Sequence, residues 1–568
     1  MAAPSLNPGA GWPGFGVQAE YVDAWGHPQQ ANPDAVRLLR AALGEHADPP
    51  DAAPRGAGGA RTRTCYLPPG KQSWGWAVQL YALRSERSWG IGDLDDLRRL
   101  GAWSARSGAE FIQLNPLHAS APVGPQQSSP YFPSSRRFRN PLYIAVEAVP
   151  GYAGVAQRLA PLVGRGRRLN SDRLIDRGAV LALKLEALET IWKSGPARTG
   201  MNRWAAAAGP ALATYGTYCA LAERHGADWR AWPAELRQPG SAATSPEARE
   251  VHDRAQFHIW LQWLLDSQLR RATTAVRPIC DLAIGADPGG ADAWIWSDEL
   301  IPGFTVGAPP DELNLQGQNW GFPAFNPQAL VDAGFGPFRE TVRANMAHAM
   351  GVRIDHVMGL FRLWMIPDGA SALDGAYVTY PSAPMLDILA EESRTARALV
   401  VGEDLGTVQP EVRAELQRRK ILSYRLLWFE EAPPSTYPRL ALSAVTTHDL
   451  PTVAGVWTGA DARAMQEVGL HPNLAANQAI VERMARFSGV PRQAPAEAAV
   501  LGAYRALRRS PSRLLAATLD DALVVGERPN IPGTVDEWPN WSLALPGGLE
   551  GLRRSRTARL LAELMAQP

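Results

Sequence analysis

Residues 351–356 read Gly-Val-Arg-Ile-Asp-His, and this short run decides both the expected fold and the expected chemistry. Side chains two positions apart on a β-strand point to the same face, so Arg353 and Asp355 are expected side by side at the end of a buried strand. The positive charge of Arg353 favours the ionised form of the Asp355 carboxyl. An ionised carboxylate held at a strand end is suited to act as a nucleophile in covalent catalysis.

Two further acidic strand ends follow along the chain. Residues 400–406 read Val-Val-Gly-Glu-Asp-Leu-Gly and place Glu403 after an apolar run. Residues 445–449 read Val-Thr-Thr-His-Asp and place Asp449 in a similar position. Three carboxylates at three strand ends predict one active site. The alternative for each is a solvated loop acid without a catalytic role.

Apolar runs along the chain predict eight strands that alternate with helical patterns. The runs cover residues 76–83, 110–115, 278–284, 351–355, 399–403, 422–428, 442–447 and 522–526. This alternation predicts an α/β fold, a (β/α)8 TIM barrel with helical insertions and a short N-terminal extension. Functional groups gather at the C-terminal ends of the strands in such barrels, so one face would carry all three acids.

The length of 568 residues fits one large domain with insertions. We interpret residues 1–64 as a short N-terminal region and flexible linker, and residues 65–568 as the catalytic barrel. Leu- and Ala-rich helical periodicity predicts a helical insertion at about 155–270. Residues 459–518 are interpreted as another helical stretch before the last strand.

A short amphipathic helix is predicted in the N-terminal region. Asn32 and Pro33 are typical of a helix start, and Gly44 is typical of its end. Between them, apolar residues fall on one helix face; these are Val36, Leu39 and Leu43.

Composition and charge narrow the class of protein. The net charge of +1 gives no long-range attraction to nucleic acid or to an anionic membrane. No apolar run approaches the roughly 20 residues of a membrane span, and no secretory signal is visible, so we expect a cytoplasmic protein. The three cysteines lack disulfide or metal spacing, which agrees with a reducing compartment.

The 20 tryptophans, against 13 phenylalanines, favour flat sugar-binding surfaces, although most could simply fill the core.

The charges near the two strand-end acids separate their expected roles. A retaining glycosidase uses a nucleophile and an acid/base about 5 to 5.5 Å apart. Asp355, beside Arg353, is the expected nucleophile. Glu403 has no cation within two residues and is the expected acid/base, which must hold a proton at neutral pH. Asp449 would stabilise the positively charged transition state, and no cofactor or metal is required by this chemistry.

Several longer blocks of sequence carry a family resemblance. They are Tyr-Ala-Leu-Arg-Ser at 81–85, Trp-Gly-Ile-Gly-Asp at 89–93, Ser-Pro-Tyr at 129–131, Asn-Pro-Leu-Tyr-Ile at 140–144, Gly-Ala-Pro-Pro-Asp at 307–311, Gly-Gln-Asn-Trp-Gly at 317–321, Arg-Ile-Asp-His at 353–356, Gly-Glu-Asp-Leu-Gly at 402–406, Thr-His-Asp-Leu-Pro at 447–451 and Asn-Ile-Pro-Gly-Thr at 530–534. In this order they resemble the 4-alpha-glucanotransferases of the amylomaltase (disproportionating enzyme) family, glycoside hydrolase family 77. The resemblance covers about residues 66–546.

The resemblance implies roles for individual residues. It assigns Asp355 as nucleophile, Glu403 as acid/base and Asp449 as the stabilising acid. It also implies that a loop at about 303–325 closes over the acceptor side. The residues implied to contact the sugar or to position the catalytic groups are Tyr131, Asp281, Gln318, Trp320, Arg353, His448 and Asn530. From the residues alone, Trp320 could be a core tryptophan, Tyr131 part of a turn, and His448 a residue that orients its own turn.

The implied activity is transfer of α-1,4-glucan segments between maltodextrins, with maltooligosaccharides as partners and with neither nucleic acid nor membrane involved. A hydrolase of α-1,4-glucans and a non-catalytic glucan-binding protein are the alternatives. The chain departs from the resemblance at two places. Most of the N-terminal β-domain of longer members is not seen, and Ser542 stands after Pro-Asn-Trp where many members have arginine, so a barrel-closing contact could be lost.

Overall fold

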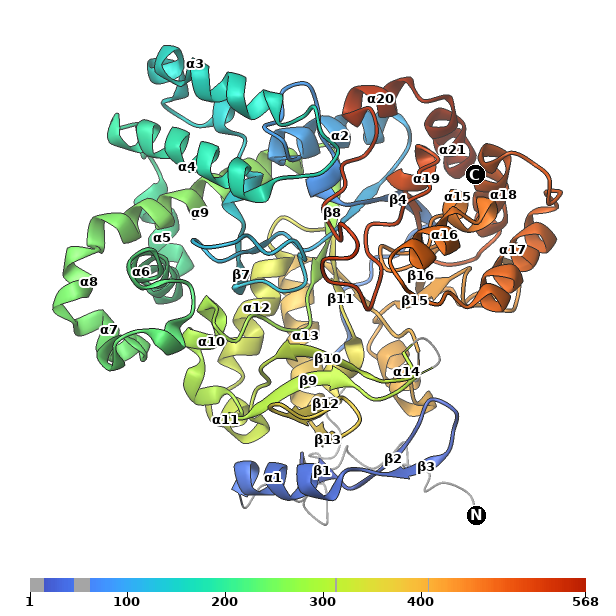
Figure 1. Cartoon of the computed structure of the whole chain (residues 1–568), viewed down its shortest axis with the longest axis horizontal. Helices are drawn as coiled ribbons and strands as arrows, with labels where there is room; N and C mark the ends of the chain where they lie inside the picture. The colour runs from blue at the N-terminus through green and yellow to red at the C-terminus, as the bar shows by residue number, and fades with distance from the viewer. Residues whose placement is uncertain (1–14, 45–61, 312–313, 407, 568) are drawn as a thin grey trace.

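A closed barrel of parallel strands lies at the centre of the protein (Figure 1). The computed structural model describes residues 15–44, 62–311, 314–406 and 408–567. The barrel strands in chain order are β4 Ser73–Val78, β5 Phe111–Leu114, β8 Arg277–Leu282, β11 Gly351–Ile354, β14 Leu399–Gly402, β15 Ser423–Leu426, β16 Ala441–Ala444 and β17 Leu514–Thr518. Each strand pairs with the next except β14 with β15, and β17 pairs with β4. A parallel bridge between Val401 and Leu422 closes the ring between β14 and β15, which confirms the TIM-barrel prediction.

Seven of the eight predicted strand positions overlap the observed barrel strands, and the eighth prediction is wrong. The last strand is Leu514–Thr518, not residues 522–526. The predicted run instead begins in the short helix α19, Leu519–Ala522, and Val524 then takes a left-handed φ of 56°. The predicted helical stretch at 459–518 therefore ends too late, because the strand occupies its last five residues. The first predicted strand is also misplaced, since residues 80–82 form a 3-10 turn beyond β4.

Close contact between neighbouring barrel strands requires glycine at one position. A Cβ on Gly75 of β4 would lie 2.2 Å from the backbone oxygen of Phe111 on β5. Around the barrel lie helices α2 Leu94–Arg106, α12 Gly336–Met346, α13 Ser382–Ala396, α14 Pro410–Arg418, α18 Ala496–Leu507 and α21 Arg556–Ala566. Further helices near the C-terminal half are α15 Val453–Thr458, α16 Ala460–Glu467, α17 Leu474–Ser488 and α20 Gly548–Arg554.

A helical region lies between β5 and β8, at one side of the barrel (Figure 1). Its helices are α3 Tyr152–Arg168, α4 Arg177–Lys193, α5 Met201–Ala208, α6 Pro210–His225, α7 Pro239–Thr244, α8 Pro246–Glu250 and α9 His252–Ala272. Helix α9 is the longest, and it packs against both α6 and the barrel helix α2. This contact fixes the helical region to the barrel.

A second, antiparallel sheet lies beside the barrel and carries part of the site. Its strand order is β1 (Val17–Gln18), β13 (Ala376–Thr379), β12 (Arg362–Pro367), β9 (Phe304–Ala308) and β10 (Gln318–Phe322). Short helices α10 Ala291–Ile295 and α11 Pro327–Asp332 flank this sheet in sequence. The N-terminal segment thus forms one edge of the sheet, and β10 forms the other.

The predicted N-terminal helix is confirmed. Helix α1 spans Pro33–Leu43, with Asn32 as its N-cap and Gly44 at its C-terminal end. The Asn32 side chain accepts hydrogen bonds from the amides of Asp34 and Ala35. Most of the predicted linker, residues 45–61, lies outside the described residues. Strands β2 Glu20–Val22 and β3 Pro28–Gln30 form a hairpin before this helix.

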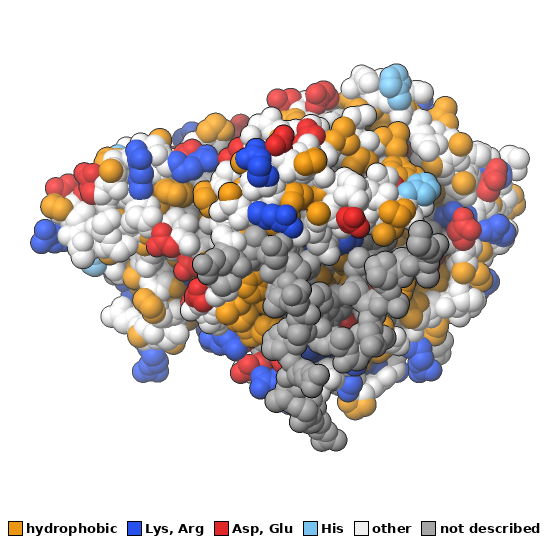
Figure 2. Space-filling model, turned by 90° about the horizontal axis from the view of Figure 1, so that it is seen from below, with side chains coloured by type: hydrophobic (Ala, Val, Ile, Leu, Met, Phe, Trp, Pro, Cys, Tyr) orange, Lys and Arg blue, Asp and Glu red, His pale blue; other side chains and the backbone are white. Residues whose placement is uncertain are grey.

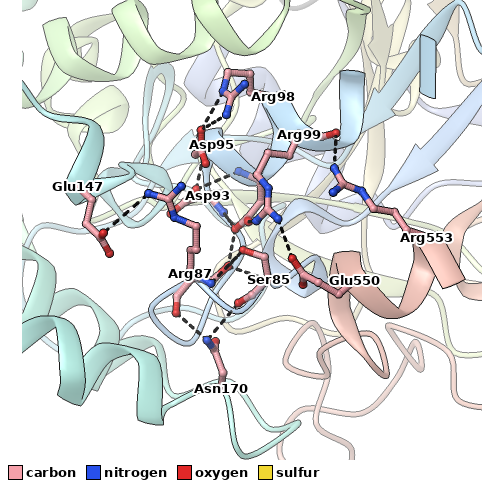
Figure 3. Close-up of polar contacts among 12 residues, drawn as sticks. Ser85, Arg87, Asp93, Asp95, Arg98, Arg99, Glu147, Asn170, Glu550 and Arg553 are labelled. Atoms are coloured by element: carbon pink, nitrogen blue, oxygen red, sulfur yellow. Dashed lines mark hydrogen bonds and ion pairs between the residues drawn. The ribbon is translucent and has the colours of Figure 1, made fainter. Parts of the chain in front are cut away.

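Polar contacts tie the loop after β4 to the helical region (Figure 3). Asn170 donates to the backbone oxygens of Ser85 (3.2 Å) and Ser88 (2.7 Å). Asp93 caps α2 in a reciprocal capping box with Asp96. Separately, Arg99 pairs with Glu550 of α20 at 2.7 Å, which connects α2 to the C-terminal helices.

The surface carries both signs of charge. On the face shown in Figure 2, acidic, basic and hydrophobic side chains of the described residues are interspersed. Within the described part of the chain, no helix combines the length and apolar character that a bilayer span demands.

Candidate active site

The C-terminal ends of adjacent barrel strands bring the predicted acids together. Asp281 lies on β8, Asp355 follows β11, and Glu403 follows β14. Parallel pairing aligns Arg353 with Asp281 and Ile354 with Gly402, so Asp355 and Glu403 continue neighbouring strands in register. Neighbouring strands run about 4.8 Å apart, close to the roughly 5 to 5.5 Å between carboxyls in retaining enzymes.

Arg353 donates hydrogen bonds to two of these carboxylates, those of Asp281 and Asp355. Its Nη1 donates to Oδ1 of Asp281 at 2.7 Å and to Oδ1 of Asp355 at 3.0 Å. The guanidinium also lies 5.5 Å from the ring centre of Tyr424 on β15. Tyr131 donates its hydroxyl to Oδ2 of Asp281 at 2.7 Å, so each Asp281 oxygen is held by a different partner. The predicted side-by-side placement of Arg353 and Asp355 is confirmed.

Glu403 is held by two backbone amides. The amide of His356 donates to Oε2 at 2.8 Å, and the amide of Leu405 donates to Oε1 at 2.9 Å. The first bond depends on an unusual backbone conformation, because His356 has a left-handed φ of 47°. Since His356 directly follows Asp355, this turn fixes the acid/base candidate to the strand end that carries the nucleophile candidate.

Burial raises the pKa of both acids. For Asp355, burial outweighs Arg353, and the carboxylates of Asp281 and Glu403 add to the rise, so its pKa reaches about 7. Burial likewise raises the pKa of Glu403 against the effects of Arg353 and the two amides. Arg353 lowers the pKa of Asp355, as the sequence indicates, but the expectation that Asp355 simply stays ionised neglected desolvation. A largely apolar cavity of about 110 Å³ lies beside Asp355 and His356.

A pH profile follows from these shifts. Attack requires ionised Asp355, whose pKa is raised to about 7, so kcat/KM should fall as pH decreases through about 7. Protonation of the leaving oxygen requires the acid form of Glu403, which burial favours by raising its pKa, so kcat/KM should fall again once the Asp355–Glu403 pair has lost its last proton. Because Asp355 and Glu403 interact, the two apparent pKa values of this profile describe the pair and not either residue alone. Initial rates with subsaturating maltotriose between pH 4 and 10 measure this; a rate that stays constant from pH 7 down to 5 would contradict it.

His448, Asp449 and Asn530 form a second polar group at the same face. His448 Nε2 lies 2.9 Å from Asp449 Oδ2, and Asn530 donates to Asp449 Oδ1 at 2.7 Å. Burial disfavours the charged forms of both His448 and Asp449. The contact between them outweighs burial, because Asp449 raises the pKa of His448. In turn, His448 and Asn530 lower the pKa of Asp449. The charged form of Asp449 is thus favoured by its contacts with His448 and Asn530. Its side chain remains 46% exposed and free to contact a ligand.

Three rings connect this group to Tyr131 and define what we call the aromatic wall: Tyr131, His448 and Trp541. The rings of Tyr131 and His448 stack at 4.9 Å, and Trp541 lies 5.3 Å from Tyr131 and 5.1 Å from His448. Sequence reasoning missed Trp541 as a member of the site. It lies in an irregular loop after β17, where no periodicity marks an inward-facing ring.

The two predicted acceptor-loop residues lie on β10 of the antiparallel sheet. Gln318 Oε1 accepts a hydrogen bond from the indole of Trp320 at 3.1 Å. The Trp320 ring contacts His356 edge-on, with ring centres 5.2 Å apart. The sheet therefore brings Trp320 next to the residue that links Asp355 to Glu403. Among the described residues, no group of three or more His, Cys, Asp and Glu side chains is arranged to hold a metal ion.

Comparison with known proteins gives a consistent result. A family model described as 4-alpha-glucanotransferase matches residues 78–549. The chain is 42% identical over 547 residues to a 4-alpha-glucanotransferase of Mycobacterium tuberculosis, covering 87% of this chain and 75% of the relative. It is 34% identical to the Haemophilus influenzae 4-alpha-glucanotransferase, covering 84% and 76%. The crystal structure of amylomaltase from Corynebacterium glutamicum superposes with a TM-score of 0.77 at 34% identity, covering 87% and 75%.

Proposed function

The chain belongs to glycoside hydrolase family 77, the 4-alpha-glucanotransferases, and we propose that it transfers α-1,4-glucan segments between maltodextrins by double displacement at Asp355 and Glu403. The single observation that carries this assignment is the pairing of Asp355 and Glu403 at adjacent strand ends, joined through the His356 amide. The two acids are thereby close enough to act on opposite sides of one glycosidic bond.

In the first half-reaction, the Asp355 carboxylate attacks the anomeric carbon of the donor. The glycosidic bond breaks, and Glu403 passes its proton to the departing 4-oxygen. Arg353 holds the attacking carboxylate through Oδ1, which leaves its other oxygen available to form the bond. We assign to the Asp449 carboxylate, whose pKa is lowered, the role of favouring the positive charge that develops on the sugar ring.

In the second half-reaction, the 4-hydroxyl of another glucan attacks the same anomeric carbon. Glu403, now ionised, takes the hydroxyl proton, and the bond to Asp355 breaks, so the configuration is retained. Transfer exceeds hydrolysis when an acceptor sugar is held more effectively than water. Trp320 and Gln318 are the groups that we assign to this acceptor side, because β10 places them beside His356.

Binding is assigned to the remaining predicted residues. Tyr131 and His448 supply stacked faces for the sugar at the cleavage point, while Asp281 holds Arg353 and Tyr131 in place. Asn530 orients Asp449, and we assign it to the acceptor side. The chemistry requires no cofactor. The free cysteines are buried, and these thiols support a reducing, cytoplasmic location as a further part of the proposal; they are Cys65, Cys219 and Cys280.

The proposed activity is tested by chromatography of the products from maltotriose. Disproportionation should give glucose together with maltotetraose and longer oligosaccharides. Production of glucose and maltose without longer products would instead indicate a hydrolase. Unchanged maltotriose, with maltotriose binding retained, would indicate a glucan-binding protein without catalysis.

Replacing Trp320 by alanine should shift the balance from transfer to hydrolysis. The side chain contacts His356 and is half-buried, so its loss opens the acceptor side to water. We expect the ratio of maltotetraose to newly formed reducing ends to fall about tenfold, the order of one lost aromatic contact of 1.4 kcal/mol. Trp25→Ala is a matched control, because Trp25 is 45% exposed in the β2–β3 hairpin. Equal ratios in the two variants would contradict the acceptor assignment.

A further inference from the structure

Arg177, at the start of helix α4, reaches the loop that carries Trp541. Its Nη2 donates to the backbone oxygen of Trp541, and its Nη1 donates to Oγ of Ser542 at 2.9 Å. The guanidinium also lies 5.1 Å from the ring centre of Tyr81. Arg177 is only 8% exposed and, within the described part of the chain, forms no ion pair with a carboxylate. A buried cation without a counter-ion depends on such acceptors and π faces.

Trp541 is in a conformation that its surroundings must maintain. Its φ of 58° is in the left-handed region, which is unfavourable for a bulky residue. On one side its amide donates to the backbone oxygen of Pro529 at 2.7 Å. On the other side its carbonyl is bonded by Arg177. With both peptide groups bonded, the ring is directed against Tyr131 and His448.

The segment before α4 pairs with the same loop. The amide of Ile175 donates to the oxygen of Ser542 at 2.8 Å, and the amide of Ala544 donates to the oxygen of Arg173 at 2.8 Å. An antiparallel bridge joins Leu174 to Leu543 between them. The connection between α3 and α4 therefore runs alongside the Trp541 loop. Position 542 is the one at which many members of the family are expected to carry arginine. Here it is a serine, whose small side chain leaves room for the guanidinium of Arg177.

We propose that Arg177 is a positioning residue for the transfer reaction, holding the Trp541 ring in the aromatic wall through the Trp541 carbonyl and Ser542. Through this contact, the helical region determines how firmly the wall is held against the sugar at the cleavage point. The effect on catalysis rests on the proposed function, whereas the hold on Trp541 does not. The two parts can therefore be tested separately.

Hydrogen exchange tests the hold on Trp541 without reference to activity. In Arg177→Met the amides of Trp541 and Ser542 should exchange at least tenfold faster than in the parent protein. Arg173→Met is the matched control, because Arg173 lies in the same segment but donates to Ala544 and Glu527 rather than to Trp541. Exchange of these two amides should be unchanged in the control. Unchanged exchange in Arg177→Met, or equal acceleration in both variants, would overturn the proposal.

Kinetics then tests the consequence. Arg177→Met should lower kcat for maltotriose by about 10- to 100-fold while KM changes less than threefold, because a displaced wall misplaces the reacting sugar more than it weakens overall binding. Arg173→Met should stay within twofold of the parent. The double variant Arg177→Met with Trp541→Leu should be no slower than Trp541→Leu alone, since both changes act through one ring. Additive losses would indicate a general structural role and would overturn the positioning role.

If Arg177→Met folds poorly, the conservative variant Arg177→Lys still tests whether Arg177 holds Trp541. Arg177→Lys retains the charge but cannot bond the carbonyl and Ser542 in the same planar arrangement. It should show intermediate exchange and intermediate kcat, at a melting temperature close to that of the parent. Parental values of both would contradict the proposal. If the parent makes no products longer than maltotriose, the proposed function fails, and the exchange experiment still decides whether Arg177 holds Trp541.

Discussion

Asp355→Asn is expected to lower transfer from maltotriose by about 10⁴-fold or more, because the amide cannot form the covalent glucosyl intermediate. The replacement keeps the shape of the side chain and removes a largely buried carboxyl whose pKa is already raised to about 7. The thermal midpoint should therefore change little, since the lost bond from Arg353 is offset by relief of desolvation. Initial rates of maltotetraose formation and the melting temperature of each variant provide the measurement.

The control for this substitution changes a carboxylate that lies far from the site. Asp34 is on helix α1 with a side chain that is 81% exposed, so Asp34→Asn should retain the parental rate. A folded Asp355→Asn protein with more than about one hundredth of the parental rate would exclude Asp355 as the nucleophile. Asp281 would then be the next candidate, because it shares Arg353 with Asp355.

Glu403→Gln should reduce transfer from maltotriose by about 10² to 10⁴-fold, the usual contribution of a positioned acid/base. The oxygen of the isosteric amide can accept from only one of the two backbone amides, that of His356 or that of Leu405, so one of the two bonds that hold this side chain is lost. An α-maltosyl fluoride donor should restore the first half-reaction, since fluoride leaves without protonation. The second half-reaction should stay slow with a sugar acceptor, because no base removes the hydroxyl proton.

Azide separates the two steps of the Glu403→Gln variant. It is a nucleophile that needs no base, so it should release the intermediate as an α-maltosyl azide, because attack opposite Asp355 on the β-linked intermediate restores the α configuration of the donor. Mass spectrometry and the anomeric coupling constant identify this product. Formation of the β-azide, or the same slow rate with maltosyl fluoride as with maltotriose, would contradict the acid/base assignment.

Strong local patterns made most of the fold predictable. The barrel strands are short and buried on both sides, so they appear in the sequence as compact apolar runs between helical patterns. The last strand was misplaced because residues 514–518 are rich in Leu and Ala, which also favour helices, whereas residues 522–526 contain two valines. Only pairing with β4 and β16 determines that residues 514–518 are the strand.

The site residues at the strand ends could be predicted from the sequence. The features of the site that depend on contacts with residues distant in the sequence could not. Arg353, Asp355 and Glu403 are fixed by their positions on β11 and β14, which the sequence pattern locates. The direction of the Asp355 pKa depends on burial by residues distant in sequence, and spacing along one strand does not report it. Trp541 and Arg177 meet across 364 residues, so their contact exists only in the folded chain.

The most direct test of transfer at this site is the mass spectrum of products formed from maltotriose in water enriched in ¹⁸O. Breakage of a bond by transfer to a sugar hydroxyl brings no oxygen from water into the products, whereas hydrolysis places one at each new reducing end. The account predicts maltotetraose, longer oligosaccharides and glucose that carry little ¹⁸O at early times, and none of these products with Asp355→Asn. Glucose and maltose that form together, with ¹⁸O at the new reducing end and without longer products, would contradict it.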